Sequence, residues 1–413
     1  MHGPHEPHEP TVGDDATHLS TIALSAIAAV VVTAGLVSLG AHTGPVQEMD
    51  EIPLAFTVET TVVHEVDVDA GADRLYGRVL TKSGDELQGY LRWQGREASW
   101  SDVLRATRPG GSALAGVRFG NVARIEPRGA RDLDLTLKSG EVVRLNAIAQ
   151  RAGAALRPMS VESEGMLVEV PMHDLESVDF LPEPLDLEPI AERIFGTLIT
   201  RSGLGFTGYI AWDLAELDDS ALLEGVQGAI PFAEIASIAR LGDGGVLVAR
   251  RDATEDRLSG TPELSESNRG IVVSDPLLGA VEVPWRQFQE LRLHPAAAVA
   301  RYEHFDGGRP LSGTVVTTSG EELTGLVRWD LDEESTWQML DGSLDGVQFH
   351  VELSQVASIA KMRYGAKVEL LDGRSFYLSA SNDVNWSNRG IEVTSDGRTH
   401  EVGWRDFVEF RRR

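Results

Sequence analysis

The chain contains no cysteine among its 413 residues. Disulfide bonds, a thiolate nucleophile and a zinc site built on cysteine are therefore excluded. Positive charge is also scarce, because 37 Lys and Arg face 64 Asp and Glu and leave a net charge of −27. A nucleic-acid partner requires a basic surface, so this composition argues against one.

Familiar catalytic signatures are missing too. The patterns GxSxG, HExxH and GxxxxGK[ST] do not occur in the sequence, so no esterase nucleophile, zincin site or P-loop is indicated. The eleven histidines share no position among the repeats described below, which excludes a repeated site built on histidine. We therefore expect no enzymatic activity, no cofactor and no metal.

Lys and Arg are absent from residues 1–73, and this part of the chain has three sections. Residues 1–18 are polar, contain proline and are predicted to be a disordered tail. Residues 19–41 are 23 uncharged, mainly apolar residues, which as a helix can cross a hydrocarbon core of about 30 Å. Because no basic segment precedes them, we expect an uncleaved transmembrane anchor rather than a signal peptide. Residues 42–74 form an acidic connector with an expected β-segment at 56–68.

The anchor predicts a single-pass membrane protein that contacts the bilayer through residues 19–41. The positive-inside rule gives no orientation, because neither flank of the anchor carries Lys or Arg. We expect the large C-terminal part on the extracytoplasmic, periplasmic side of the membrane. The cytoplasmic side is the alternative.

A pattern of three glycines and one tryptophan occurs three times in the remaining chain. Within each copy these residues are 7, 5 and 4 positions apart. The three sets are Gly77, Gly84, Gly89 and Trp93; Gly196, Gly203, Gly208 and Trp212; and Gly313, Gly320, Gly325 and Trp329. The copies begin 119 residues (196 minus 77) and 117 residues (313 minus 196) apart, which predicts tandem repeats of about 100 residues. We place them at 75–180, 194–293 and 311–410, separated by linkers that contain proline or glycine.

Each copy of the pattern is typical of a β-hairpin. An aliphatic run, a Ser-Gly turn and a second run that ends at the tryptophan follow one another. The glycine inside the second run (Gly89, Gly208 or Gly325) predicts a bulge or a sharp bend. We expect the tryptophans to fill the core, and a ligand-stacking surface is the alternative.

Each repeat reads as a doublet. In the second repeat both halves close with the pattern apolar-Pro-apolar-x-x-apolar-x-x-apolar, at 230–238 and 283–291. The order of strand, glycine turn, strand, further strands and a short turn resembles small SH3-like barrels of the Sm and PRC-barrel kind. The resemblance implies a mainly β fold in which each repeat is a pair of small barrels, six in all. It implies no particular activity.

The most distinctive polar stretch is SNDVNWSNRGIEV at 381–393, which the second repeat echoes at 265–273. One interpretation is a binding loop that displays polar side chains. These are Asn382, Asp383, Asn388 and Arg389 in the third repeat, with Asn268 and Arg269 in the second. The alternative is a turn whose arginine stacks over the tryptophan of the repeat. We align the segment 163–166 of the first repeat with this stretch, so the first repeat is expected to lack the loop.

Carboxylates follow the tryptophan in two of the repeats. Asp213 and Asp330 occupy the next position, and more acidic residues come shortly after. Calcium could use such oxygen atoms, but the spacing matches no calcium-binding loop. The alternative is a solvated acidic loop.

A single anchor followed by repeated β modules predicts a non-enzymatic, membrane-anchored scaffold or interaction protein. A second hypothesis is an accessory subunit that clamps a membrane protein complex, since the layout is similar to that of the H subunit of photosynthetic reaction centres. A third is a cell-envelope module that binds glycans or calcium-bridged polymers. In the first two cases we expect a protein partner to dock on the second and third repeats, around Arg269 and Arg389.

Overall fold

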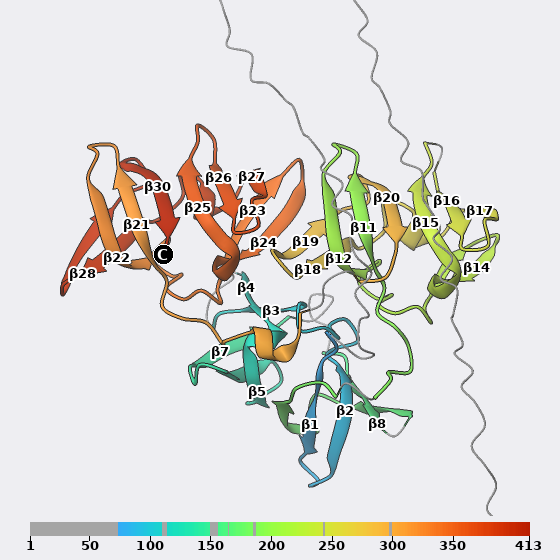
Figure 1. Cartoon of the computed structure of the whole chain (residues 1–413). Coiled ribbons are helices and arrows are strands. Elements are labelled where there is room, and N and C mark those ends of the chain that lie inside the picture. Colours follow the sequence, from blue (N-terminus) through green and yellow to red (C-terminus); the bar gives the residue numbers. More distant parts are fainter. Residues whose placement is uncertain are drawn as a thin grey trace, which may run out of the picture. The chain divides into compact units, whose positions relative to one another are not determined.

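The protein is described from a computed structural model (Figure 1). It describes residues 73–109, 114–148, 156–163, 165–184, 187–242, 244–296 and 300–413. The expected tail and anchor lie outside these residues, as does the connector up to residue 72. Within them the chain is mainly β, with several antiparallel sheets and only short 3-10 helices. None of the helices in these ranges is long and apolar enough to cross a membrane.

The segment 75–180 forms a ten-stranded sheet with the order β4-β3-β7-β6-β5-β10-β1-β2-β8-β9. Its strands are β1 (Tyr76–Thr81), β2 (Glu86–Arg92), β3 (Val103–Thr107), β4 (Leu114–Arg118), β5 (Val122–Pro127), β6 (Asp132–Leu137), β7 (Val142–Ala147), β8 (Met159–Ser163), β9 (Met166–Val170) and β10 (Leu175–Phe180). A 3-10 turn, η1 (Phe119–Asn121), precedes β5.

The segment 194–293 contributes eight strands to a second sheet and two to a separate hairpin. Its strands are β11 (Phe195–Thr200), β12 (Gly205–Ala211), β13 (Leu222–Gly225), β14 (Gly228–Pro231), β15 (Ile235–Arg240), β16 (Val246–Arg250), β17 (Glu255–Leu258), β18 (Ile271–Asp275), β19 (Gly279–Val283) and β20 (Phe288–Leu293). The 3-10 turns are η2 (Phe232–Glu234) and η3 (Pro262–Leu264), and η4 (Tyr302–His304) follows in the next linker.

The segment 311–410 has the same succession of elements. Its strands are β21 (Ser312–Thr317), β22 (Glu322–Arg328), β23 (Met339–Leu344), β24 (Val347–Glu352), β25 (Val356–Lys361), β26 (Ala366–Leu370), β27 (Ser375–Leu378), β28 (Ile391–Ser395), β29 (Arg398–Val402) and β30 (Phe407–Arg412). The 3-10 turns are η5 (Leu353–Gln355) and η6 (Asn382–Val384).

One strand order runs through all three segments. It is β7-β6-β5-β10-β1-β2-β8-β9 in the first, β17-β16-β15-β20-β11-β12-β18-β19 in the second and β27-β26-β25-β30-β21-β22-β28-β29 in the third. The hairpin that follows the tryptophan is placed differently each time. In the first segment β3 pairs with β7, in the second β13 and β14 pair only with each other, and in the third β24 pairs with β19 of the preceding segment. The last of these pairings makes one sheet out of strands from two segments (Figure 1).

The glycines of the first two strands face one another in pairs: Gly77 with Gly89, Gly196 with Gly208, and Gly313 with Gly325. A Cβ atom on Gly89, Gly208 or Gly325 would lie 1.8, 2.3 or 2.2 Å from a carbonyl oxygen of the next strand. These glycines therefore permit a close approach of two backbones, but the expected bulge is not at these positions. The register shifts fall at the far end of the first strand, for example between Leu80 and Thr81.

The three tryptophans lie in the core, as expected. Trp93, Trp212 and Trp329 are at most 2% exposed. Trp329 packs edge-on against Trp404 and Phe407, with ring centroids 6.2 and 5.2 Å away, and its indole N–H donates to the Asp383 carbonyl at 2.9 Å. The indole N–H, which is the polar group of this large ring, therefore has a hydrogen-bond partner inside the protein.

We predict that Gly208→Ala destabilises the protein by about 1–3 kcal/mol or more, because the new methyl group would overlap backbone atoms that cannot rotate away. The nearest of these atoms is the Ser274 carbonyl oxygen. Gly205→Ala is the matched control, since it lies in the same strand and its Cβ would meet nothing within 4 Å. Chemical denaturation of both variants checks this, and equal stabilities would contradict the steric role of Gly208.

Candidate functional site

A tight turn after each tryptophan builds the first polar layer. The backbone N–H of the tryptophan donates to the backbone carbonyl of the glutamate four residues later, at 2.7 Å for Glu97, 2.9 Å for Glu216 and 2.7 Å for Glu333. The glutamate N–H donates back to the tryptophan carbonyl in each case. The chain enters these turns through a left-handed residue, with φ of 47° at both Asp213 and Asp330. Asp tolerates this conformation better than most residues do.

The turn carries its glutamate into the protein. Glu97 and Glu333 are each 8% exposed, and one carboxylate oxygen of Glu97, Glu216 and Glu333 has no hydrogen-bond partner. Burial raises the pKa of Glu97 and of Glu216 to about 7. Burial, together with the neighbouring carboxylate of Asp383, raises the pKa of Glu333 as well. Sequence reasoning missed this shared position, although the spacing of four from each tryptophan is visible in the sequence.

The aspartates that follow Trp212 and Trp329 are bound by the arginines of the polar loops. Arg269 donates its backbone N–H to Asp213 at 2.6 Å and its guanidinium to the same carboxylate at 2.8 and 3.1 Å. Arg389 makes the same set of contacts to Asp330, which is fully buried. The structure therefore brings these four predicted residues together in two equivalent clamps. A solvated acidic loop is wrong here, because the loop folds back so that the arginine covers the carboxylate.

The other residues predicted to bind also have partners within the protein. Asn268 and Asn388 accept the N–H of the glycine two residues later, at 2.8 and 3.0 Å. Asn382 donates to Asp330. Asp383 is 5% exposed and accepts the Asp341 N–H at 2.6 Å. These contacts shape the loop itself, so the polar groups of the predicted binding loop largely serve its own turn.

The exposed aromatic group of this loop is a different residue. Trp386 is 64% exposed, whereas the tryptophans of the repeated pattern are buried. The second segment has Glu266 at the corresponding position, so this exposed ring belongs to the third segment only.

The strand register changes the alignment of the first segment with the other two. Leu91 pairs with Val161, as Ile210 pairs with Val273 and Val327 with Val393. Counting back along each strand places Arg157 level with Arg269 and Arg389. The segment 163–166 is instead the turn between β8 and β9. Our alignment of 163–166 with the polar loop is therefore wrong, because the polar loop precedes β18 and β28 whereas 163–166 follows the equivalent strand β8.

Three carboxylates approach one another in the third segment. Asp330, Asp332 and Glu333 each place an oxygen atom within 4.8 Å of the others. The Arg389 guanidinium forms ion pairs with both Asp330 and Asp332. This side chain supplies the positive charge that the cluster needs, so the cluster is accounted for by an intramolecular ion pair.

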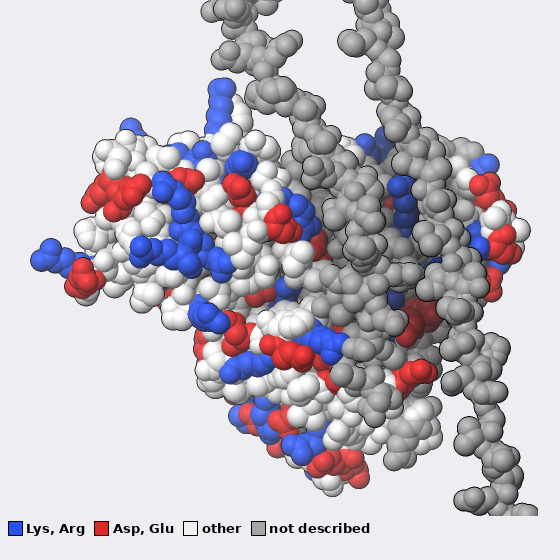
Figure 2. All heavy atoms as spheres, viewed as in Figure 1, with Lys and Arg blue, Asp and Glu red and all other residues white. Residues whose placement is uncertain are grey.

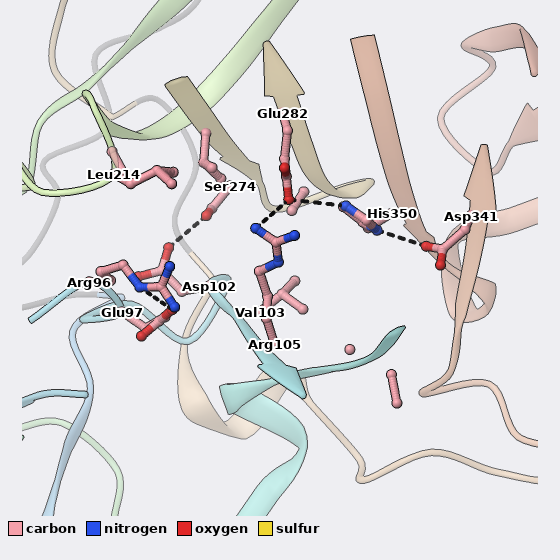
Figure 3. Close-up of a pocket in the computed structure, with 15 residues that line it drawn as sticks. Arg96, Glu97, Asp102, Val103, Arg105, Leu214, Ser274, Glu282, Asp341 and His350 are labelled. Carbon is pink, nitrogen blue, oxygen red and sulfur yellow. Dashed lines mark hydrogen bonds and ion pairs between the residues drawn. The ribbon is translucent and has the colours of Figure 1, made fainter. Parts of the chain in front are cut away.

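A second polar site lies where the three segments meet (Figure 3). A cavity of about 50 Å³ is lined by side chains from β3, β18, β19, β23 and β24, which leaves room for only a few water molecules. Across it runs a chain of charged contacts. Arg105 pairs with Glu282 at 2.8 Å, Glu282 contacts His350 at 3.2 Å, and His350 contacts Asp341 at 2.7 Å.

His350 is held as a cation by this arrangement. Burial lowers its pKa, but the hydrogen bonds to Asp341 and Glu282 outweigh burial and raise the pKa to about 9. Arg105, Glu282 and His350 come from three different segments, so the chain of contacts ties the segments together. Sequence reasoning could not find it, because only the fold brings these residues within reach.

Asp102 makes a further junction between the first two segments. Its carboxylate accepts the N–H groups of Ala98 and Ser99, the hydroxyl of Ser274 at 2.6 Å and the guanidinium of Arg193 at 3.2 Å. Asp102 and Arg193 are nearly inaccessible to solvent. A buried pair with this many hydrogen bonds fixes the relative position of the elements that carry it.

Comparison with models of known protein families finds no match, and neither a curated protein nor a solved structure matches this chain.

We predict that Arg389→Ala destabilises the protein by about 1–3 kcal/mol, because it leaves the buried Asp330 carboxylate without its cation. The change Asp330→Asn in the same chain should recover part of this loss. Arg328→Ala is the control, since its pair with Glu392 is partly exposed and should contribute about 0–1 kcal/mol. Thermal denaturation of the unsubstituted protein, the two single variants and the double variant measures these differences. If Arg389→Ala does not change the melting temperature, Arg389 does not stabilise the fold and the binding interpretation is favoured.

We predict that the protein is more stable at pH 6 than at pH 9. The pKa values of Glu97, Glu216 and His350 are raised on folding to about 7, 7 and 9. Raised values contribute stability that is present below the unfolded pKa and is lost as the pH rises through the folded pKa. The variant Glu97→Gln mimics the protonated side chain, so it should raise the melting temperature at pH 9 and leave it nearly unchanged at pH 5. A melting temperature that rises toward pH 9 would contradict these shifts.

Proposed function

We propose that this chain is a non-enzymatic, membrane-anchored scaffold or interaction protein. Residues 19–41 hold it in the bilayer, and the segments 75–180, 194–293 and 311–410 act as three modules of one design, each built from a pair of small β-barrels. The modules lie on the extracytoplasmic side and assemble with a protein partner in a membrane complex. An accessory subunit of such a complex is the same proposal in a narrower form.

The observation that carries the proposal is the way the three segments are joined. The ladder between β19 and β24 runs from Gly279 opposite Val351 to Glu282 opposite Gln348. Arg118, which is 1% exposed, reaches from the first segment to Glu352 of the third at 3.2 Å and to the Asp275 carbonyl of the second at 2.5 Å. Segments tied by buried ion pairs and a shared ladder suit a rigid platform better than a hinged enzyme.

The fate of the polar loops also supports a structural role. Each of the eight residues that the sequence singled out for binding contacts another residue of the same chain, and Asp330 and Asp383 are buried. A base in an active site needs access to a substrate, which the buried carboxylates of Asp330 and Asp383 do not have. On the face drawn in Figure 2, acidic and basic side chains lie next to one another, which fits a protein partner better than a nucleic acid.

The test is extraction of the full-length, affinity-tagged chain from membranes with a mild detergent. We expect the chain in the membrane fraction and a partner in fixed proportion to it after purification. A variant lacking residues 19–41 should move to the soluble fraction. A full-length chain that is soluble without detergent, or that purifies alone at every detergent concentration, would contradict the proposal. Digestion of the modules by protease added to spheroplasts checks the side of the membrane.

The alternative envelope module would use the exposed Trp386 as a stacking surface for a sugar ring. Retention of the purified chain on a glycan resin, lost in Trp386→Ala, would favour that alternative over the scaffold.

A further inference from the structure

The strand order shared by the three segments ends at equivalent strands, and these strands differ in whether another strand pairs with their outer edge. These are β9, β19 and β29, each the last in its order. The outer edge of β19 is covered by β24 in an antiparallel ladder of four residue pairs. Within the described ranges no strand pairs with the outer edge of β9 or of β29. This position of the fold is therefore able to accept an added antiparallel strand, and two of its three instances are open.

The two open edges differ in chemistry. β29 reads Arg-Thr-His-Glu-Val, and its first four residues are exposed and polar, which protects an edge against pairing. β9 reads Met-Leu-Val-Glu-Val, with Met166 62% and Leu167 57% exposed. Its last three residues repeat the Val-Glu-Val of the covered strand β19. β9 thus combines the sequence of an edge that is paired with the exposure of one that is not.

We propose that β9 pairs with β9 of a second copy of this chain, antiparallel and across a two-fold axis. The proposal goes beyond the scaffold function and does not depend on the anchor. A two-fold axis pairs the same strand of each copy, so one contact covers the β9 edge of both copies and leaves no further β9 edge open. The exposed Met166 and Leu167 of each copy then lose much of their contact with water.

The charges of β9 are compatible with this pairing. With Val168 opposite the partner's Val168, Leu167 lies opposite the partner's Glu169. The two glutamates are then offset and do not face each other, which avoids the repulsion of like charges directly opposite across a ladder. On the inner side Glu162 of β8 lies opposite Leu167, so Leu167 separates this carboxylate from the partner's Glu169.

The absence of cysteine makes the test direct, because a single introduced thiol has no competitor in the chain. Val168→Cys in the full-length protein, purified in mild detergent, is oxidised gently and analysed without reducing agent. Opposed residues in an antiparallel pair lie about 4.5–5.5 Å apart between Cα atoms, within the range that a disulfide spans. We expect a covalent dimer. His400→Cys is the matched control, because His400 occupies the same position on the open polar strand β29, and it should stay monomeric.

A second change and a second measurement separate this pairing from other contacts. Leu167→Lys places a charge on the edge, so adding it to Val168→Cys should abolish the covalent dimer. In the unsubstituted protein, hydrogen exchange of the amides of 166–170 should slow as the protein concentration rises.

Three results would overturn the proposal. One is the absence of a covalent dimer with Val168→Cys while light scattering reports a monomer. Another is a dimer that forms equally with His400→Cys or survives Leu167→Lys, which would place the contact elsewhere. The third is protection of the 166–170 amides that is independent of concentration, which would mean that another strand of the same chain or of a different protein covers β9.

Discussion

The structure depends on three places where two backbones come so close that no side chain fits between them. At the glycine pairs Gly77–Gly89, Gly196–Gly208 and Gly313–Gly325 a Cβ atom would overlap a backbone carbonyl, so only glycine permits this approach of the strands. The residue that follows each of these second strands is a tryptophan that lies in the core. The left-handed turn after the tryptophan then reverses the chain and carries a glutamate inward behind it.

Burying so many acids has a cost, and the protein meets it in two ways. Asp213 and Asp330 each receive an arginine that binds through both its backbone and its side chain. Glu97 and Glu216 have no such partner for one of their oxygens, and burial raises their pKa values so that the protonated form is favoured. The first solution gives a clamp that sets the shape of a loop. The second makes stability depend on pH. Both occur at equivalent places in different segments, so they belong to the design of the unit.

The contacts between segments follow a different logic from the contacts within them. Arg105, Arg118, Asp102 and His350 each bridge elements that are far apart in the sequence. These contacts differ from one junction to the next, whereas the hydrogen bonds of the turn after the tryptophan recur in each segment. The hairpin after the tryptophan shows the same freedom, because it pairs once within its own sheet, once only with itself and once with the preceding segment. These junctions therefore differ from one another, and among the strands that the structure describes none pairs with the outer edge of β9.

Local chemistry was readable from the sequence alone. A mainly β fold, the Ser-Gly turns and the burial of Trp93, Trp212 and Trp329 all follow from residues a few positions apart, whose conformational limits do not depend on distant neighbours. The partners of buried charges did not follow. That Arg389 would clamp Asp330, 59 residues away, or that His350 would meet Glu282 required the register of strands that only folding aligns. The misplaced alignment of 163–166 has the same cause, because letter patterns shift easily in a loop while ladder pairing does not. The composition of each hairpin can thus be read from neighbouring residues, whereas the partners of the buried charges and the pairing of the strand edges depend on contacts between distant segments.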